Sequence, residues 1–147
     1  MIRHFRGDNF FLSNFFQKPV TYQGITYQNN EAAFQAMKTL DENARKTFAT
    51  LGPSEAKKMG RRIALRPDWE DVKYGIMYDI VKAKFTQNND LGNKLLATGD
   101  EELVEDTTSW HDNIWGDCTC PKCKNIVGKN YLGNILMTVR KELRDDI

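Results

Sequence analysis

The order of apolar and polar residues predicts a short β-hairpin followed by a mainly helical chain. Val20-Thr21-Tyr22 and Ile25-Thr26-Tyr27 are rich in β-branched and aromatic side chains. Gln23-Gly24 between them is a turn sequence in which glycine supplies a positive φ. Beyond the hairpin, apolar residues recur at the spacing of α-helices. The pattern therefore predicts a small N-terminal hairpin followed by helices.

The longest expected helix begins at Asp68 and runs to about Asn88, with an apolar stripe from Trp69 to Phe85. An earlier helix begins at a cap on Asn29 or Asn30 and runs to about Leu40. Further helices are expected over residues 42–51, 53–62, 90–98 and 130–145, and a strand over 103–105. Residues 107–129 show little periodicity, and long irregular segments of this kind are usually functional or disordered. Trp110, Trp115 and the three cysteines argue against disorder.

Length and charge narrow the classes of protein. The 147 residues fit one compact domain over 1–147, and 21 Lys and Arg against 20 Asp and Glu give a net charge of +1. No global field therefore draws the chain to nucleic acid or to an anionic membrane, so an anionic ligand must be recognised locally. No apolar stretch is long enough to span a membrane, and the start lacks the apolar segment of a signal peptide. We expect a cytoplasmic protein without membrane contact.

Three polar residues of different chemistry share one face of the first expected helix. Glu31, Gln35 and Lys38 align a carboxylate, an amide and an ammonium group. Glu31 also lies at the helix N-terminus, where unpaired N–H groups favour its ionised form. The alternative is an ordinary solvated stripe on an amphipathic helix. The pattern leaves both interpretations open.

Two lysines fall within the apolar stripe of the longest helix. Lys73 and Lys84 project in nearly the same direction as Trp69. Both cations can face a cavity that holds an anion such as phosphate, or they can extend from the edge of the core to water.

The irregular segment contains an aromatic residue, a flexible glycine and an acid in succession, Trp115-Gly116-Asp117. A carboxylate can stabilise an oxocarbenium-like transition state and activate water, and an aromatic plane can stack on a base. This combination suits a sugar or nucleoside site. A Trp-Gly pair can also simply pack a loop.

Taken together, the short motifs resemble the YbiA-like N-glycosidases, also called the NADAR family, over nearly the whole chain. The resemblance rests on an ordered series of matches: Phe11-Leu12-Ser13-Asn14-Phe15, Glu31 to Lys38, Met59-Gly60-Arg61, Trp69 with Lys73, Lys84-Phe85, Leu95 to Gly99, Trp115-Gly116-Asp117, Gly128-Lys129-Asn130 and Leu132-Gly133. So many matches in order are more specific than any one of them.

The resemblance implies a mainly helical α+β domain that hydrolyses an N-glycosidic bond between a ribose and a base or amine. The implied substrates are ribosylamino-pyrimidine phosphates of riboflavin synthesis or ADP-ribosylated guanine in nucleic acid. Glu31 matches the catalytic acid of the family, and Asp117 matches the acid of its Trp-Gly-Asp motif. A fixed carboxylate stabilises positive charge on the ribose and can take a proton from water. The division of roles between the two acids is left open.

The other matched residues are assigned to substrate binding by side-chain type. Ammonium groups suit phosphate, aromatic rings suit the base or ribose, and amides suit polar edges. The set consists of Lys38, Lys73, Lys84, Trp69, Trp115, Gly116, Asn14, Gln35 and Asn130.

The chain departs from the simplest family pattern at Cys118-Thr119-Cys120-Pro121-Lys122-Cys123. Three closely spaced thiols are unlike a secreted disulfide framework. We expect reduced cysteines and no cofactor, with zinc at Cys118, Cys120 and Cys123 as the alternative. A fourth zinc ligand would come from His111, His4, another chain or water.

Two other classes of function compete with the hydrolase. A non-catalytic module that binds ADP-ribose or a nucleotide is the main alternative, although binding alone does not require carboxylates beside an anionic ligand. An adaptor organised by a zinc knuckle at 118–123 is the other. The sequence leaves the oligomeric state undecided.

Overall fold

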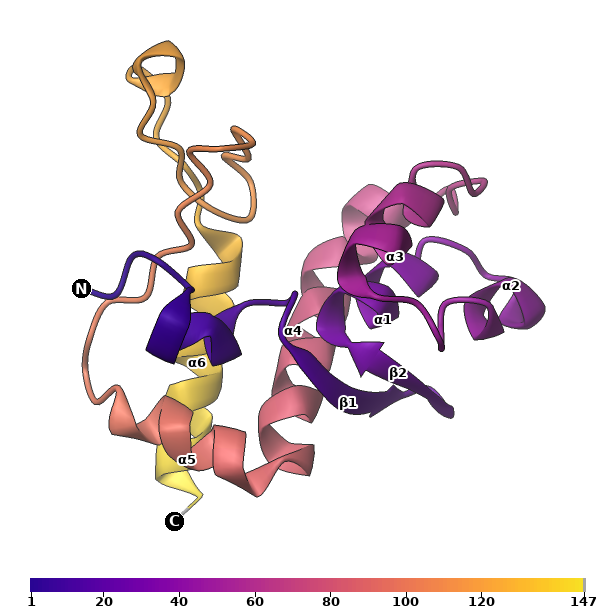
Figure 1. Ribbon diagram of the computed structural model, residues 1–147, viewed down its shortest axis with the longest axis horizontal. Helices are drawn as coiled ribbons and strands as arrows, with labels where there is room; N and C mark the ends of the chain where they lie inside the picture. The colour runs from indigo at the N-terminus through magenta and orange to yellow at the C-terminus, as the bar shows by residue number, and fades with distance from the viewer. Residues whose placement is uncertain (147) are drawn as a thin grey trace. The chain divides into compact units, whose positions relative to one another are not determined.

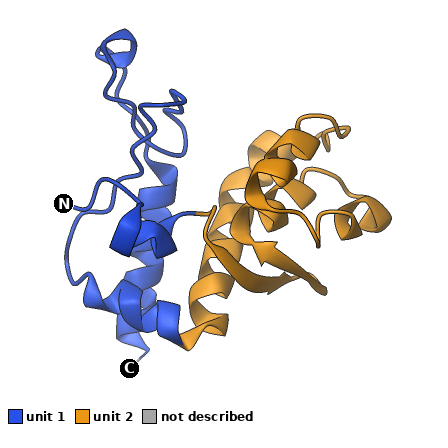
Figure 2. Cartoon of the chain, in the orientation of Figure 1, with its two compact units in different colours: residues 1–13, 90–147 blue, residues 14–89 orange. Residues whose placement is uncertain are grey.

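The structure is a computed structural model that describes residues 1–146 (Figure 1). Its contacts divide the chain into two compact units (Figure 2). Unit 2 comprises residues 14–89, and unit 1 comprises residues 1–13 together with the chain from residue 90 onward. The units are described separately. Ile147, at the end of the predicted single domain, lies outside the described residues.

Unit 2 begins with the hairpin of β1 (Gln17–Tyr22) and β2 (Ile25–Asn29). The antiparallel register pairs Val20 with Tyr27, and a bulge lies between Gln17 and Val20. Gln23 and Gly24 have φ values of 49° and 83°. Positive φ at both central residues is typical of the type I′ turn, which matches the twist of a hairpin. The predicted hairpin is confirmed.

Four helices complete unit 2: α1 (Asn30–Ala36), α2 (Glu42–Lys46), α3 (Pro53–Gly60) and α4 (Trp69–Gln87). Helix α1 packs against both strands, α3 and α4, so each of its seven residues is buried. Helix α4 also packs against β1, where the Gln87 side chain hydrogen-bonds both the N–H and the carbonyl of Thr21 at 2.8 Å. The polar residues of α1 therefore lie inside unit 2 rather than on a solvated face.

Unit 1 contains η1 (Gly7–Leu12), α5 (Asn89–Ala97), η2 (Pro121–Cys123) and α6 (Tyr131–Asp145). Its core is formed by apolar side chains of α5, α6 and η1, among them Leu12, Leu91, Leu95, Leu132, Ile135 and Val139. Residues 107–129 carry the short helix η2 and an isolated bridge from Asp117 to Asp106, and otherwise consist of turns and irregular backbone.

The predicted fold class, α+β and mainly helical with a small sheet, is confirmed. Some details differ. Helix α1 ends at Ala36 instead of continuing to about Leu40, and α2 ends at Lys46 instead of continuing to residue 51, because the following N–H groups bond to carbonyls three residues back in turns. Residues 103–105 form no strand, and the two 3-10 helices were not predicted. Leu103 instead makes an isolated bridge with Ile2. Among the described residues, every helix is too short or too polar to cross a bilayer.

Candidate functional site

The carboxylate of Glu31 is buried in the first turn of α1, with 8% of the residue exposed. Asn29 caps the helix by accepting a hydrogen bond from the N–H of Ala32 at 2.8 Å. The N–H of Glu31 donates to the carbonyl of Asn14 at 3.1 Å. Because the helix N-terminus favours negative charge and both neighbours fix the backbone, the position of this carboxylate is well defined.

Gln35 fixes the side chain of Glu31 from the next turn of α1. Its Nε2 donates to Glu31 Oε1 at 2.8 Å. Gln35 packs on Gly60, where an added Cβ would lie 1.9 Å from Gln35 Oε1. A hydrogen bond to an ionised acceptor is stronger than a neutral one. Gln35 is therefore a positioning residue for Glu31, and Gly60 supplies the space that it occupies.

Asn14 lies beside the N-terminus of α1. It is 8% exposed, and its Oδ1 accepts from Asn30 Nδ2 at 3.3 Å while its Nδ2 contacts Met77 Sδ at 3.4 Å. The Asn14 side chain thus connects α1 to α4, and its backbone carbonyl binds the N–H of Glu31. The residue whose amide is predicted to bind substrate thus also holds the backbone of Glu31 through its own carbonyl.

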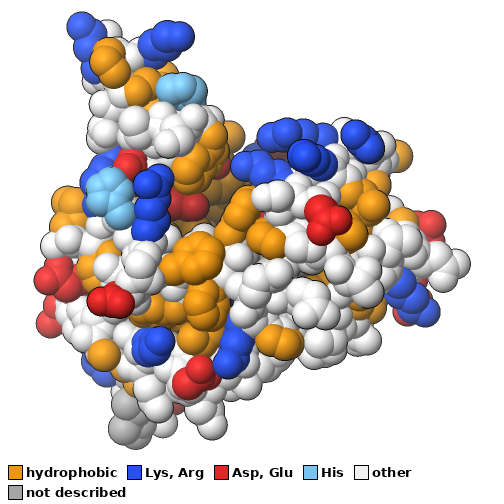
Figure 3. Space-filling view, in the orientation of Figure 1, with side chains coloured by type: hydrophobic (Ala, Val, Ile, Leu, Met, Phe, Trp, Pro, Cys, Tyr) orange, Lys and Arg blue, Asp and Glu red, His pale blue; other side chains and the backbone are white. Residues whose placement is uncertain are grey.

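The pKa of Lys38 is shifted by burial and by the charged side chains around it. Burial lowers the pKa of Lys38, the charge of Glu31 opposes that effect, and the charges of Arg61 and Lys57 lower it further. Figure 3 shows Lys and Arg side chains gathered over α3 and the turn that follows it. Like charges held together in this way suit an anionic group such as phosphate.

The three remaining candidates of unit 2 lie on α4 in different surroundings. Trp69 is buried against Phe34, with ring centroids 5.0 Å apart. Lys73 Nζ forms an ion pair with Glu70 at 2.5 Å. Lys84 is 1% exposed, its ammonium group lies 5.6 Å from the Phe16 ring centroid, and burial lowers its pKa to about 7. The predicted common stripe therefore contains one fully buried cation, Lys84, and one half-buried cation, Lys73, whose ion-pair partner Glu70 is exposed.

Asp117 occupies the irregular segment of unit 1. Its Oδ2 accepts from Arg3 Nη2 at 2.9 Å, and its Oδ1 accepts from the N–H of Gly128 at 3.1 Å. The backbone N–H of Asp117 donates to the carbonyl of Glu105 at 2.9 Å. These bonds hold the carboxylate between three separate stretches of unit 1. Arg3 and Gly128 were not assigned any role from the sequence.

Asn130 has both ends of its amide bound to backbone. Its Nδ2 donates to the carbonyl of Leu103 at 2.9 Å, and its Oδ1 accepts from the N–H of Glu105 at 3.0 Å. The residue has a φ of 50° and immediately precedes α6. Asn130 therefore fixes residues 103–105 against α6. Its predicted contact with substrate stays a prediction.

Trp115 and Gly116 have packing partners within unit 1. The Trp115 ring meets Tyr131 edge-on, with centroids 5.9 Å apart. A Cβ on Gly116 would lie 2.3 Å from Thr107 Cγ2 and 2.5 Å from the Glu105 carbonyl oxygen. The glycine is thus needed for close approach of two backbone segments.

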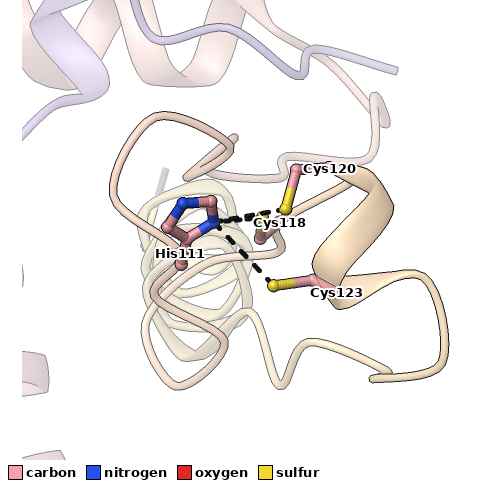
Figure 4. Close-up of side chains that lie close together, drawn as sticks. All are labelled: His111, Cys118, Cys120 and Cys123. Atoms are coloured by element: carbon pink, nitrogen blue, oxygen red, sulfur yellow. Dashed lines mark hydrogen bonds between the residues drawn. The ribbon is translucent and has the colours of Figure 1, made fainter.

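The three cysteines lie beside His111 in unit 1 (Figure 4). Nδ1 of His111 lies 3.3 Å from Cys118 Sγ, 3.2 Å from Cys120 Sγ and 3.9 Å from Cys123 Sγ. No disulfide links these cysteines. Of the four sources of a fourth ligand considered from the sequence, the structure brings His111 to the thiols.

The structure joins part of the predicted set directly. Hydrogen bonds connect Asn14, Glu31 and Gln35 in unit 2, and Lys38 is coupled to Glu31 by charge. Asp117 belongs to unit 1 and is described with it. Sequence reasoning missed the supporting role of Gly60 and assigned no role to Lys57 and Arg61. A glycine beside basic residues carries no signal of the glutamine that packs on it.

The family profile of the NADAR domain matches residues 3–144, so this chain belongs to the NADAR family. N-glycosidase YbiA of Escherichia coli strain K12 is 40% identical over 134 residues, which cover 89% of this chain and 79% of that protein. A riboflavin biosynthesis protein of Vibrio vulnificus is 37% identical over 138 residues, covering 92% of this chain and 36% of that protein.

A solved structure agrees with this assignment. The NMR structure of E. coli YbiA has a TM-score of 0.83 and 37% sequence identity, covering 99% of this chain and 86% of that chain. The family resemblance drawn from the motifs is therefore confirmed.

Proposed function

We propose that this chain hydrolyses the bond between C1′ of a phosphorylated ribosyl group and a nitrogen of a base or amine, with Glu31 as the catalytic carboxylate. The enzyme class, a hydrolase of N-glycosyl bonds, follows from membership of a family whose relatives are named N-glycosidases. The observation that supports a role for Glu31 is its buried carboxylate, oriented by Gln35 at 2.8 Å and coupled to Lys38.

The reaction makes demands that this carboxylate meets. As the C1′–N bond breaks, its electron pair leaves with nitrogen and positive charge develops on the ribose. A fixed, ionised carboxylate stabilises that charge and can accept a proton from the water that attacks C1′. A proton added to the departing nitrogen completes the balance, with one water consumed. We propose Asp117 as a second participating carboxylate.

We further propose that the phosphate of the substrate binds the cationic group formed by Lys38, Lys57 and Arg61. Their mutual effect on the pKa of Lys38 indicates that positive charge is concentrated there. Trp69 and Trp115 are proposed to contact the base or ribose, and Asn14, Gln35, Lys73, Lys84, Gly116 and Asn130 to support binding. We favour a small ribosylamino-pyrimidine phosphate over an ADP-ribosylated nucleic acid, because a net charge of +1 gives the chain no overall attraction to nucleic acid.

The test is product formation followed by mass spectrometry. A ribosylamino-pyrimidine phosphate and an oligonucleotide carrying ADP-ribosylated guanine are incubated separately with wild type, Glu31→Gln and Glu42→Gln. Glu42 is an exposed carboxylate on α2 and serves as the control. We expect wild type and Glu42→Gln to release ribose 5-phosphate from the small substrate, and Glu31→Gln to release almost none.

Other outcomes separate the competing ideas. Release of ADP-ribose from the oligonucleotide alone would replace the proposed substrate. Binding of ADP-ribose without cleavage of either substrate would favour the non-catalytic module. The combined Glu31→Gln and Asp117→Asn variant tests whether the acids share one step: if they do, the second substitution adds little to the loss caused by the first.

A further inference from the structure

Unit 1 contains four metal-binding side chains that the hydrolytic reaction does not use. The ligand atoms of His111, Cys118, Cys120 and Cys123 all lie within 4.8 Å of one another. The cysteines come from η2 and the irregular chain just before it, whereas His111 comes from a turn seven residues before Cys118. Figure 4 shows the His111 ring with Nδ1 turned toward the sulfur atoms. We propose that these four residues bind a structural zinc ion.

The spacing of the ligand atoms fits a tetrahedral zinc site. With Zn–S of about 2.3 Å and Zn–N of about 2.05 Å, tetrahedral angles place a nitrogen and a sulfur ligand about 3.6 Å apart. The three distances from His111 Nδ1 are 3.2, 3.3 and 3.9 Å. They bracket the required value. A disulfide requires sulfur atoms about 2.0 Å apart, joins only two of the thiols and gives the imidazole no role.

The donor set also selects the metal. Three thiolates and an imidazole form one of the common structural zinc sites, and they fill all four positions of a tetrahedron. Because four protein ligands leave no open position for water, the proposed ion is structural rather than catalytic. Binding releases one proton from each of the three thiols and leaves the oxidation state of the metal unchanged.

The backbone holds the histidine in an unusual conformation that directs it to the thiols. His111 has a φ of 59°, in the left-handed region that non-glycine residues seldom adopt. Its N–H donates to the carbonyl of Thr107 at 2.7 Å, which closes the turn. The N–H of Cys118 donates to Asn113 Oδ1 at 2.9 Å, and the N–H of Cys123 donates to the carbonyl of Cys120 at 3.0 Å. The ligand-bearing turns are thus fixed by local hydrogen bonds.

The segment that carries the ligands has almost no hydrophobic core. Within residues 108–127, all of which the structure describes, only Gly116, Cys118 and Cys123 are buried. The apolar side chains of Trp110, Ile114, Ile126 and Val127 are exposed. Small structures that bury little apolar surface usually need a metal or disulfides for stability. Zinc would supply the stabilisation that side-chain packing does not.

The site adjoins Asp117, so zinc would also order that residue. Cys118 follows Asp117 directly in the chain, and Gly128, beyond the last cysteine, donates to Asp117 Oδ1 at 3.1 Å. Loss of zinc would therefore loosen both sides of this carboxylate. The zinc proposal does not depend on Asp117 being catalytic, since metal content is measured without substrate.

The test begins with metal analysis of the full chain. The protein is expressed with a cleavable tag that contains no histidine and is purified without chelators under reducing conditions. We expect close to one zinc per chain in wild type. Titration of the metal-free protein with Co²⁺ should produce the thiolate charge-transfer absorption and intense visible bands of tetrahedral cobalt, and Zn²⁺ should abolish them.

Matched variants locate the site. His111→Asn removes the imidazole and introduces a residue that tolerates a left-handed backbone, and Cys120→Ser removes the least buried thiol. Both should lose most of the bound zinc and alter the cobalt spectrum. His4→Ala removes the other histidine and should bind zinc as wild type does.

The proposal is overturned if wild type contains no zinc and metal-free wild type gives no cobalt–thiolate absorption. It is equally overturned if His111→Asn and Cys120→Ser bind zinc as tightly as wild type, or if the purified protein holds iron instead. A wild-type mass lower by two hydrogens, without metal, would identify a disulfide in its place. If a variant does not fold, the wild-type cobalt spectrum still decides the question.

Discussion

Replacing Gly60 with alanine should weaken both the fold and the proposed reaction, because Gly60 makes room for the residue that orients Glu31. A Cβ at position 60 would lie 1.9 Å from Gln35 Oε1 and 2.7 Å from Gln35 Cδ. Gln35 is 5% exposed, so its amide cannot move to solvent easily. The amide would have to shift by more than about 1 Å to restore van der Waals contact. The hydrogen bond to Glu31 would then be lost or distorted.

The magnitude follows from opposing effects at this position. Overpacking of a core costs about 1–3 kcal/mol, and loss of a hydrogen bond to a charged group costs about 1.5–3 kcal/mol. Alanine gains about 1 kcal/mol over glycine in a helix, and the φ of Gly60 is not in the positive region. The unfavourable effects are larger, so Gly60→Ala should lower the free energy of unfolding by about 2 kcal/mol. It should also reduce kcat, because Glu31 loses its orientation.

The assay is urea denaturation together with kcat on the ribosyl phosphate substrate. Gly75→Ala is the control: Gly75 is exposed within α4, and an added Cβ meets nothing within 4 Å. It should raise stability by up to about 1 kcal/mol and leave kcat unchanged. In a Gln35→Ala background the Gly60→Ala penalty should disappear. The reasoning is refuted if Gly60→Ala is as stable and as active as wild type.

Three further predictions concern charge, capping and metal. The folded pKa of Lys84, about 7, lies below its unfolded value of about 10.4, so the unfolded chain binds more protons between these values and wild-type stability rises with pH there. The free energy of unfolding of wild type, measured by urea denaturation, should therefore rise by roughly 3 kcal/mol relative to that of Lys84→Met between about pH 7 and about pH 9.5. If the difference in free energy of unfolding between the two proteins stays constant with pH, the lowered pKa is contradicted. Asn29→Ala removes the cap of α1 and two further hydrogen bonds at a fully buried residue, so it should cost about 2–4 kcal/mol in the same assay; a loss below about 1 kcal/mol would contradict the capping argument. A tight zinc chelator should lower the Tm of wild type by about 10 °C in a thermal melt but leave that of His111→Asn unchanged, and equal shifts would argue against the proposed site.

Local sequence signals predicted the elements whose causes are themselves local. The hairpin follows from Gln23-Gly24 between two β-favouring triplets, and both turn residues adopt the positive φ that this turn requires. Helix α4 follows from sustained apolar periodicity after Asp68, and it begins at Trp69, one residue after the expected start, with Asp68 at the N-cap position.

The end of α1 depends on a residue distant in the chain and was predicted wrongly. The N–H of Arg66 donates to the carbonyl of Lys38 at 2.8 Å, and its Nη1 donates to the carbonyl of Met37 at 3.4 Å. These carbonyls are used outside the helix, which ends at Ala36. The periodicity around Leu40 contains no trace of this contact.

The predicted strand at 103–105 was wrong for a similar reason. Its composition favours β structure, but a strand also needs a partner strand. Ile2 supplies two backbone hydrogen bonds, to Glu102 and from Val104, while the side chain of Asn130 takes the N–H of Glu105. A side-chain amide cannot extend a ladder, so the pairing stops at one bridge.

In the candidate site too, local contacts could be predicted from the sequence and contacts between distant segments could not. Spacing placed Glu31 and Gln35 one turn apart, and the structure joins them by a hydrogen bond. It did not reveal that every residue of α1 is buried, because that depends on the strands and helices around it. Likewise, three thiols indicated a metal as an alternative, but only the turn at His111 shows which histidine joins them.

The most direct measurement of the central proposal is the single-turnover rate constant for C1′–N cleavage, with enzyme in excess over the ribosyl phosphate substrate. This quantity isolates the chemical step from binding and product release. We predict that Glu31→Gln lowers it by at least about 100-fold, the effect expected of a carboxylate that acts in the transition state. Glu42→Gln should match wild type. A rate constant for Glu31→Gln within a few-fold of wild type would contradict the proposed role of Glu31.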